Sequence, residues 1–167
     1  MPVTAAQVRE LRDKTGAGIM DCKRALEESD GDIAKAEAIL NKKGLASAAK
    51  KAGRSTSEGL VVSYIHTGGR VGSMIELNCE TDFVARTDEF EVLGRNLAMQ
   101  VAAMSPRFVD RDSVPEDAEE VKDEELLLEQ EYIRDSSMKI ADLVTDSIGK
   151  LGENIHIRRF SRFELGG

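Results

Sequence analysis

The spacing of apolar residues changes once along this chain, and the polar segment 53–59 (GRSTSEG) separates the two patterns. Before this segment, apolar residues recur three or four positions apart, as they do on one face of a helix. After it, stretches appear in which apolar residues alternate, which is typical of strands. A Gly- and Ser-rich polar stretch between two such patterns indicates a link between domains. The sequence therefore predicts a helical unit at 1–52, a linker at 53–59 and a second domain at 60–167.

Three short helices are expected in the first unit, and together they would make a compact bundle. Thr4 and Gln7 have the spacing of a capping box at the start of the first helix. The second helix is expected to begin near Ile19. The third should end at Gly44, where a glycine follows two lysines as at many helix C-termini, and a separate helix would cover 45–52.

The second domain mixes strands and helices. Strands are expected at 60–66 and 71–79, joined by a turn-forming TGGR segment as a hairpin. Apolar stripes at helical spacing predict helices at 90–104, with Met104 on its buried stripe, and 140–151. A last strand should cover 154–163. This order of elements predicts an α+β domain.

Two stretches of the second domain lack a regular pattern. The alternation of the last strand slips at Arg158 and Arg159, as in a bulged or edge strand. The stretch 110–135 carries 12 acidic and 3 basic residues, with only a thin apolar face. We expect this stretch to be a partly helical connection that packs lightly.

Composition disfavours several classes of function. The net charge is −8, and an acidic chain repels phosphate backbones, so direct nucleic-acid binding is not expected. No apolar run approaches the roughly 20 residues that span a bilayer, and the N-terminus lacks a signal-peptide layout. Cys22 and Cys79 lack the spacing of a disulfide framework or a zinc site. A cytoplasmic protein with reduced thiols and no membrane contact is therefore expected.

The motifs that usually accompany catalysis or cofactor binding are missing or misplaced. The stretch 16–21 (GAGIMD) falls short of a dinucleotide fingerprint and follows a predicted helix, whereas that fingerprint must follow a strand. There is no P-loop pattern, and His66 and His156 have no Cys or His nearby. We therefore expect no enzymatic activity, no cofactor and no bound metal.

The connection between the second strand and the next helix carries an aromatic ring. Residues 78–86 (NCETDFVAR) place Phe83 beside Asp82 at this corner. Corners of this kind normally hide large apolar groups, so residue type alone favours a buried Phe83. The alternative is that the ring is offered to a partner protein as a wedge. The pattern by itself leaves both open.

The corner closely resembles the signature of the translation elongation factor Ts family. The segments 15–26 (TGAGIMDCKRAL), 48–54 (AAKKAGR), 76–86 (ELNCETDFVAR) and 151–166 (LGENIHIRRFSRFELG) are all similar to that family. They cover most of the chain, and two of them are long signatures in the right order. The family consists of guanine-nucleotide exchange factors for elongation factor Tu.

This resemblance implies both a fold and a mechanism. The fold would be an N-terminal three-helix bundle like a ubiquitin-associated (UBA) domain, followed by an α+β core of a three-stranded antiparallel sheet with helices packed on one face. The corner residues Thr81, Asp82, Phe83 and Val84 would bind elongation factor Tu, displace its Mg²⁺ and promote release of GDP. Both GDP-bound and nucleotide-free elongation factor Tu are thus expected partners.

The resemblance also implies weaker contacts and a dimer. Ile19 and Met20 in the bundle, and His66 and Leu151 in the core, are secondary candidates for partner contact. Short members of the family form homodimers, and the unpaired edges of a three-stranded sheet are a liability that proteins cover or pair. The competing interpretation is an adaptor of the ubiquitin-associated or ribosome-associated type, without exchange activity.

Overall fold

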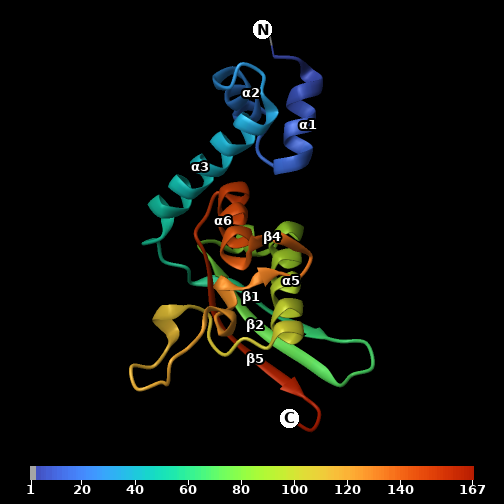
Figure 1. Cartoon of the computed structure of the whole chain (residues 1–167), viewed down its shortest axis with the longest axis vertical. Helices are drawn as coiled ribbons and strands as arrows, with labels where there is room; N and C mark the ends of the chain where they lie inside the picture. The colour runs from blue at the N-terminus through green and yellow to red at the C-terminus, as the bar shows by residue number, and fades with distance from the viewer. Residues whose placement is uncertain (1–2) are drawn as a thin grey trace.

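The N-terminal part of the chain is helical (Figure 1), in a computed structural model that describes residues 3–167. It consists of α1 (Ala5–Thr15), α2 (Ile19–Glu28) and α3 (Ile33–Lys51). Residues 1–2 of the expected bundle lie outside the described residues. The three helices enclose one cluster of fully buried side chains: Leu11, Cys22, Ala25, Leu26 and Ala36.

Local capping explains where these helices start and stop. Thr4 and Gln7 form the predicted capping box, in which Gln7 N donates to Thr4 Oγ1 at 3.3 Å and Thr4 N donates to Gln7 Oε1 at 3.0 Å. Gly16 ends α1 with φ of 65°, a left-handed conformation that favours glycine. Asp32 caps α3 by accepting from Lys35 N at 3.0 Å.

The predicted break at Gly44 is wrong, because α3 continues through this residue to Lys51 as a single helix. A glycine inside a helix destabilises the helix by about 1 kcal/mol relative to alanine, so another interaction must stabilise α3 at this position. Here α3 packs against α6 (Ile140–Leu151), and a Cβ at Gly149 would lie 3.9 Å from the Gly44 Cα. That distance is an ordinary van der Waals contact, and the packing of α3 against α6 offsets the local cost of Gly44.

The rest of the chain is a sheet with helices on one face, which confirms the expected α+β fold (Figure 1). The sheet is antiparallel, in the order β1 (Glu58–Ile65), β2 (Val71–Cys79) and β5 (Ile155–Glu164). The α5 helix (Asp88–Met104) packs against all three strands, and α6 contacts α5 and β5. Leu77, Phe90, Leu97 and Ile140 are among the fully buried side chains between these layers.

The registers of the sheet agree with two details of the sequence. The pairing of β2 with β5 shifts between Glu76 and Leu77, which face Arg159 and Ile157, so Arg158 is the extra residue of the predicted bulge. The α5 helix comes close to β1 because Gly94 has no side chain where Val62 lies. Met104 was expected on the buried stripe of α5, but it is exposed because it lies at the end of the helix.

The acidic stretch is better packed than expected. It contains Leu126 and Leu127, which are only 1% and 0% exposed, so the prediction of light packing is wrong. The buried Gln100 amide of α5 holds it, since Nε2 donates to Glu131 O at 3.0 Å and Oε1 accepts from Ile133 N at 3.0 Å. Its regular elements are short: η1 (Arg111–Ser113), η2 (Asp123–Glu125), η3 (Leu127–Glu129), β3 (Glu131–Tyr132) and β4 (Asp135–Lys139).

The α3 helix connects the two parts of the chain. Its N-terminal half contributes Ala36 to the bundle core, and its C-terminal half places Ala48 against the core beneath the sheet. The division into 1–52, 53–59 and 60–167 stays a prediction, although β1 already begins at Glu58. Within residues 3–167, no helix is both long and apolar enough to cross a membrane.

Candidate partner-binding site

The corner after β2 is a single helical turn, α4 (Asp82–Ala85), and Thr81 is its N-cap. The Thr81 Oγ1 atom accepts from Val84 N at 3.4 Å, and Ala85 N donates to Thr81 O at 3.3 Å. The carboxylate of Asp82 does not cap this helical turn, because the preceding threonine does so. Asp82 instead pairs with Arg86 at 3.0 Å on the surface. An exposed ion pair of this kind contributes little to stability.

The corner presents Phe83 to solvent. Its side chain is 79% exposed, the largest exposed fraction among the large hydrophobic residues that are exposed in residues 3–167. Its neighbours turn inward, since Val84 packs against the core and Ala85 is buried. The interpretation of Phe83 as a core residue is therefore wrong. A ring that contributes no packing to the fold is available for contact with another molecule.

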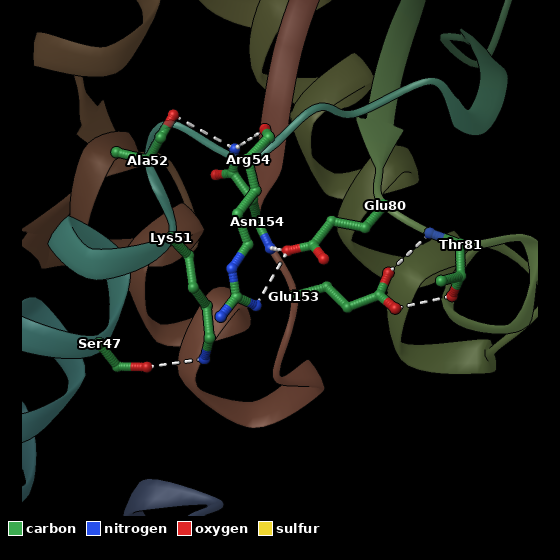
Figure 2. Close-up of polar contacts among 8 residues, drawn as sticks. All are labelled: Ser47, Lys51, Ala52, Arg54, Glu80, Thr81, Glu153 and Asn154. Carbon is green, nitrogen blue, oxygen red and sulfur yellow. Dashed lines mark hydrogen bonds and ion pairs between the residues drawn. The ribbon is translucent and has the colours of Figure 1, made fainter.

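The segment that leads into β5 also holds the corner in place through hydrogen bonds (Figure 2). The Glu153 carboxylate accepts two hydrogen bonds from Thr81, from the backbone N at 2.9 Å and from Oγ1 at 2.6 Å. The Cys79 Sγ donates to Thr81 O at 3.1 Å. Burial, assisted by the nearby Glu153 carboxylate, raises the pKa of the Cys79 thiol to about 11. Cys79 is thus a buried neutral thiol, as expected.

The corner lies close to the end of α3. Glu80 accepts from Asn154 N at 2.8 Å and from Arg54 Nη1 at 3.4 Å. The Asn154 side chain in turn donates to Arg54 O at 2.9 Å and to Ala52 O at 3.5 Å (Figure 2). Sequence reasoning missed these contacts, because residues 52–54, 80–81 and 153–154 meet only in the folded chain.

The secondary candidates fall into different places. Ile19 and Met20 begin α2 and are 55% and 58% exposed, so they offer an apolar surface on the bundle. Leu151 is half-buried at the end of α6, two residues before Glu153. His66 lies at the opposite end of the hairpin, roughly 25 Å from the corner at about 3.3 Å per strand residue. The structure therefore brings Leu151, but not His66, toward the Thr81–Val84 corner.

A second exposed apolar surface covers the face of the sheet opposite the helices. Ile65 of β1 and Phe163 of β5 flank Gly72 of β2, and they are 66% and 74% exposed. Val61 and Met74 lie on the same face and are 69% and 51% exposed. This surface was not predicted from the sequence. The signal was present, since these residues alternate with the buried positions of each strand.

The described residues provide no evident metal centre. No group of three His, Cys, Asp or Glu side chains within 3–167 is arranged to hold a metal ion. What the corner does offer is an exposed ring beside a carboxylate on a backbone held by hydrogen bonds, an arrangement suited to contact with another protein.

Comparison with known proteins places these features in one family. The sequence model of the family described as Elongation factor TS matches residues 46–132. Elongation factor Ts of Anaeromyxobacter dehalogenans is 50% identical over 194 aligned positions, which cover 98% of this chain and 89% of the relative. Elongation factor Ts of Thermotoga neapolitana is also 50% identical, with 99% and 98% covered. That of Fervidobacterium nodosum is 47% identical, with 99% and 100% covered.

Proposed function

Because the chain belongs to the elongation factor Ts family of translation elongation factors, we propose that it exchanges guanine nucleotide on elongation factor Tu. It binds GDP-bound elongation factor Tu, displaces the Mg²⁺ of the partner and releases GDP, so that GTP can bind. The chain itself neither holds nor hydrolyses nucleotide, and it acts in the cytoplasm. The observation that carries this proposal is Phe83, 79% exposed on a corner whose backbone is held by hydrogen bonds.

The energetics show why the ring cannot act alone. An exchange factor binds the nucleotide-free partner more tightly than the loaded one, and this coupling is reciprocal. Weakening nucleotide binding by about 10⁴-fold requires roughly 5.5 kcal/mol of differential binding. Burial of one phenylalanine ring supplies about 1.5–3 kcal/mol. The remainder must come from Thr81, Asp82, Val84 and further contacts between the two proteins.

We assign those further contacts to the helical bundle, as a docking element within residues 1–52. Ile19 and Met20 are exposed at the start of α2, and neither contributes to the buried cluster of the bundle. Large apolar side chains exposed side by side are typical of a protein interface. In this proposal the bundle sets the affinity, and the 60–167 core with its Thr81–Val84 corner displaces the nucleotide.

We further propose that two chains associate through the open face of the sheet. Val61, Ile65, Met74 and Phe163 form an exposed apolar surface there, and β1 and β5 are the two edges of the sheet. Both cysteines are buried, so this association does not depend on a disulfide. Sedimentation under reducing conditions at micromolar concentration should show a dimer. Phe163→Ser should shift it toward the 18.3 kDa monomer, whereas Val92→Ser on α5 should not.

The exchange proposal is tested by mixing the purified chain with elongation factor Tu that carries fluorescent GDP. A catalytic amount of the chain should accelerate release of the label by at least tenfold in the presence of excess unlabelled nucleotide. The released nucleotide should remain GDP. Binding without faster release would support the adaptor interpretation and contradict exchange.

A further inference from the structure

The β2 and β5 strands stay linked beyond the end of their backbone ladder. The last backbone pair is Cys79 with Ile155. Beyond this pair, the backbone N–H groups of Asn154 and Thr81 donate to side chains. Each is taken by a carboxylate from the opposite strand: Asn154 N donates to Glu80 at 2.8 Å, and Thr81 N donates to Glu153 at 2.9 Å. We call this reciprocal arrangement the carboxylate clasp.

Every polar atom of Thr81 has a hydrogen-bond partner, in the clasp or next to it. The N–H and the hydroxyl each donate to one oxygen of Glu153, the hydroxyl oxygen also accepts from Val84 N, and the carbonyl accepts from Cys79 Sγ. Two parallel bonds to one carboxylate fix direction as well as distance. Since Thr81 is the N-cap of α4, its orientation decides where the helical turn begins and where Phe83 points.

The segment that carries Glu153 is itself immobilised. Asn154 is 8% exposed, its backbone N is bonded to Glu80, and its amide group bridges the carbonyls of Ala52 and Arg54 (Figure 2). Glu153 therefore approaches Thr81 from a backbone that is fixed on two sides. The same contacts join the corner to the chain segment that leaves α3.

We propose that Glu153 is a positioning residue for nucleotide exchange, which holds Thr81 so that Phe83 projects from the corner in the orientation that enters the partner. This inference rests on the proposed exchange function. The residue type is specific to the task, because a carboxylate offers two acceptors to the two donors of Thr81. A glutamine in its place offers one acceptor and turns an N–H₂ donor toward the other N–H or O–H.

The test compares Glu153→Gln and Glu153→Ala in the full chain, with Glu129→Gln as a matched control. Glu129 accepts a surface hydrogen bond from Lys139 at 2.8 Å and does not contact the corner. The maximal rate of GDP release should fall about tenfold in Glu153→Ala, and less in Glu153→Gln, because each lost charge-assisted bond loosens the corner. The concentration that gives the half-maximal rate should stay within about twofold, because the docking surface on the bundle is unchanged.

A second variant connects the effect to Thr81. Thr81→Val removes the hydroxyl that donates to Glu153 and also accepts from Val84 N, so this variant alone should slow exchange. In the Glu153→Ala background the combined loss should be smaller than the sum of the two single losses, because both changes break the same Thr81–Glu153 contact. Additive losses, or a folded Glu153→Ala variant with the full maximal rate, would overturn the inference.

A measurement without the partner separates this inference from the exchange function itself. Cys79 contacts Thr81, so displacement of the corner should expose its thiol to a thiol reagent in chains that carry Cys22→Ala. Both Glu153 variants remove the same charge near Cys79, so the difference between them reports the position of the corner. Faster labelling of Glu153→Ala than of Glu153→Gln supports positioning, even if the wild type released no GDP. Equal labelling of these two variants contradicts it.

Discussion

Two adjoining helices, α4 and α5, each begin with a threonine cap and carry a phenylalanine in their first turn. One of the two rings is exposed and the other is buried. Thr81 caps the first, and Phe83 is 79% exposed. Thr87 caps the second by accepting from Phe90 N at 3.3 Å, and Phe90 is 0% exposed. The two segments read TDF and TDEF, so they differ by a single residue between cap and ring.

That one residue changes the direction of the ring. Successive helical residues are rotated by about 100°, so a phenylalanine at the second helical position points away from one at the third. In α5 this rotation turns Phe90 into the cluster beneath the sheet, whereas in α4 it turns Phe83 outward and leaves Val84 and Ala85 to face the core. Similar local sequences can therefore contribute to the core at one helix start and remain exposed for recognition at the next.

The largest effect is expected at Phe90. Phe90→Ala removes a fully buried ring and leaves a cavity, so it should lower the free energy of unfolding by about 3–5 kcal/mol. Denaturant unfolding followed by circular dichroism measures this. If the loss were below 1 kcal/mol, the contrast between the two helices would not hold.

Phe83→Ala should leave stability nearly unchanged and slow nucleotide exchange. The exposed ring contributes little packing, so the free energy of unfolding should change by less than about 0.5 kcal/mol. GDP release from elongation factor Tu should slow by about 10- to 150-fold, the equivalent of burying one phenylalanine in the partner. Unfolding and release are measured on the same sample. A marked loss of stability, or full exchange by a folded variant, would each overturn the role of Phe83 as a wedge.

Changes on the surface of the helical bundle are expected to have a smaller effect, and only on binding. The double change Ile19→Ala and Met20→Ala should weaken binding to elongation factor Tu by roughly 1–2 kcal/mol and leave the maximal rate of release nearly unchanged, because docking and displacement are separate. A titration of the release rate against the concentration of the chain distinguishes the two parameters. Val92→Ala, at a 55% exposed position on α5, is the control. Unchanged affinity in the double variant would remove this surface from the interface.

The smallest effect is expected at Asp82. Asp82→Ala removes an exposed pair with Arg86, so it should change stability by no more than about 0.5 kcal/mol. It should slow GDP release only a few-fold, because the ring remains in place. Release measured at low and at high salt tests the electrostatic part, since screening should reduce the difference between variant and wild type. A decrease in the rate of GDP release as large as that of Phe83→Ala would mean that the carboxylate and the ring contribute equally to exchange.

Much of the fold could be predicted from local patterns. The capping box at Thr4, the start of α2 at Ile19, the hairpin and the irregularity near Arg158 all depend on neighbours in the sequence, and the structure confirms them. The break at Gly44 was wrong because α3 packs against α6, a helix that is distant in the sequence. The dense packing of Leu126 and Leu127 was missed because it depends on residues distant in the sequence, such as the core cluster that includes Leu127.

For the candidate site, sequence patterns were enough to identify the residues of the corner, its place between β2 and α5, and the family that the chain resembles. The exposure of Phe83, the capping of the turn by Thr81 rather than Asp82, and the contact of Glu153 with Thr81 appear only in the folded chain. The physical reason is distance along the chain. Capping and periodicity act over three or four residues, whereas exposure and the Glu153 contact depend on segments separated by 72 positions.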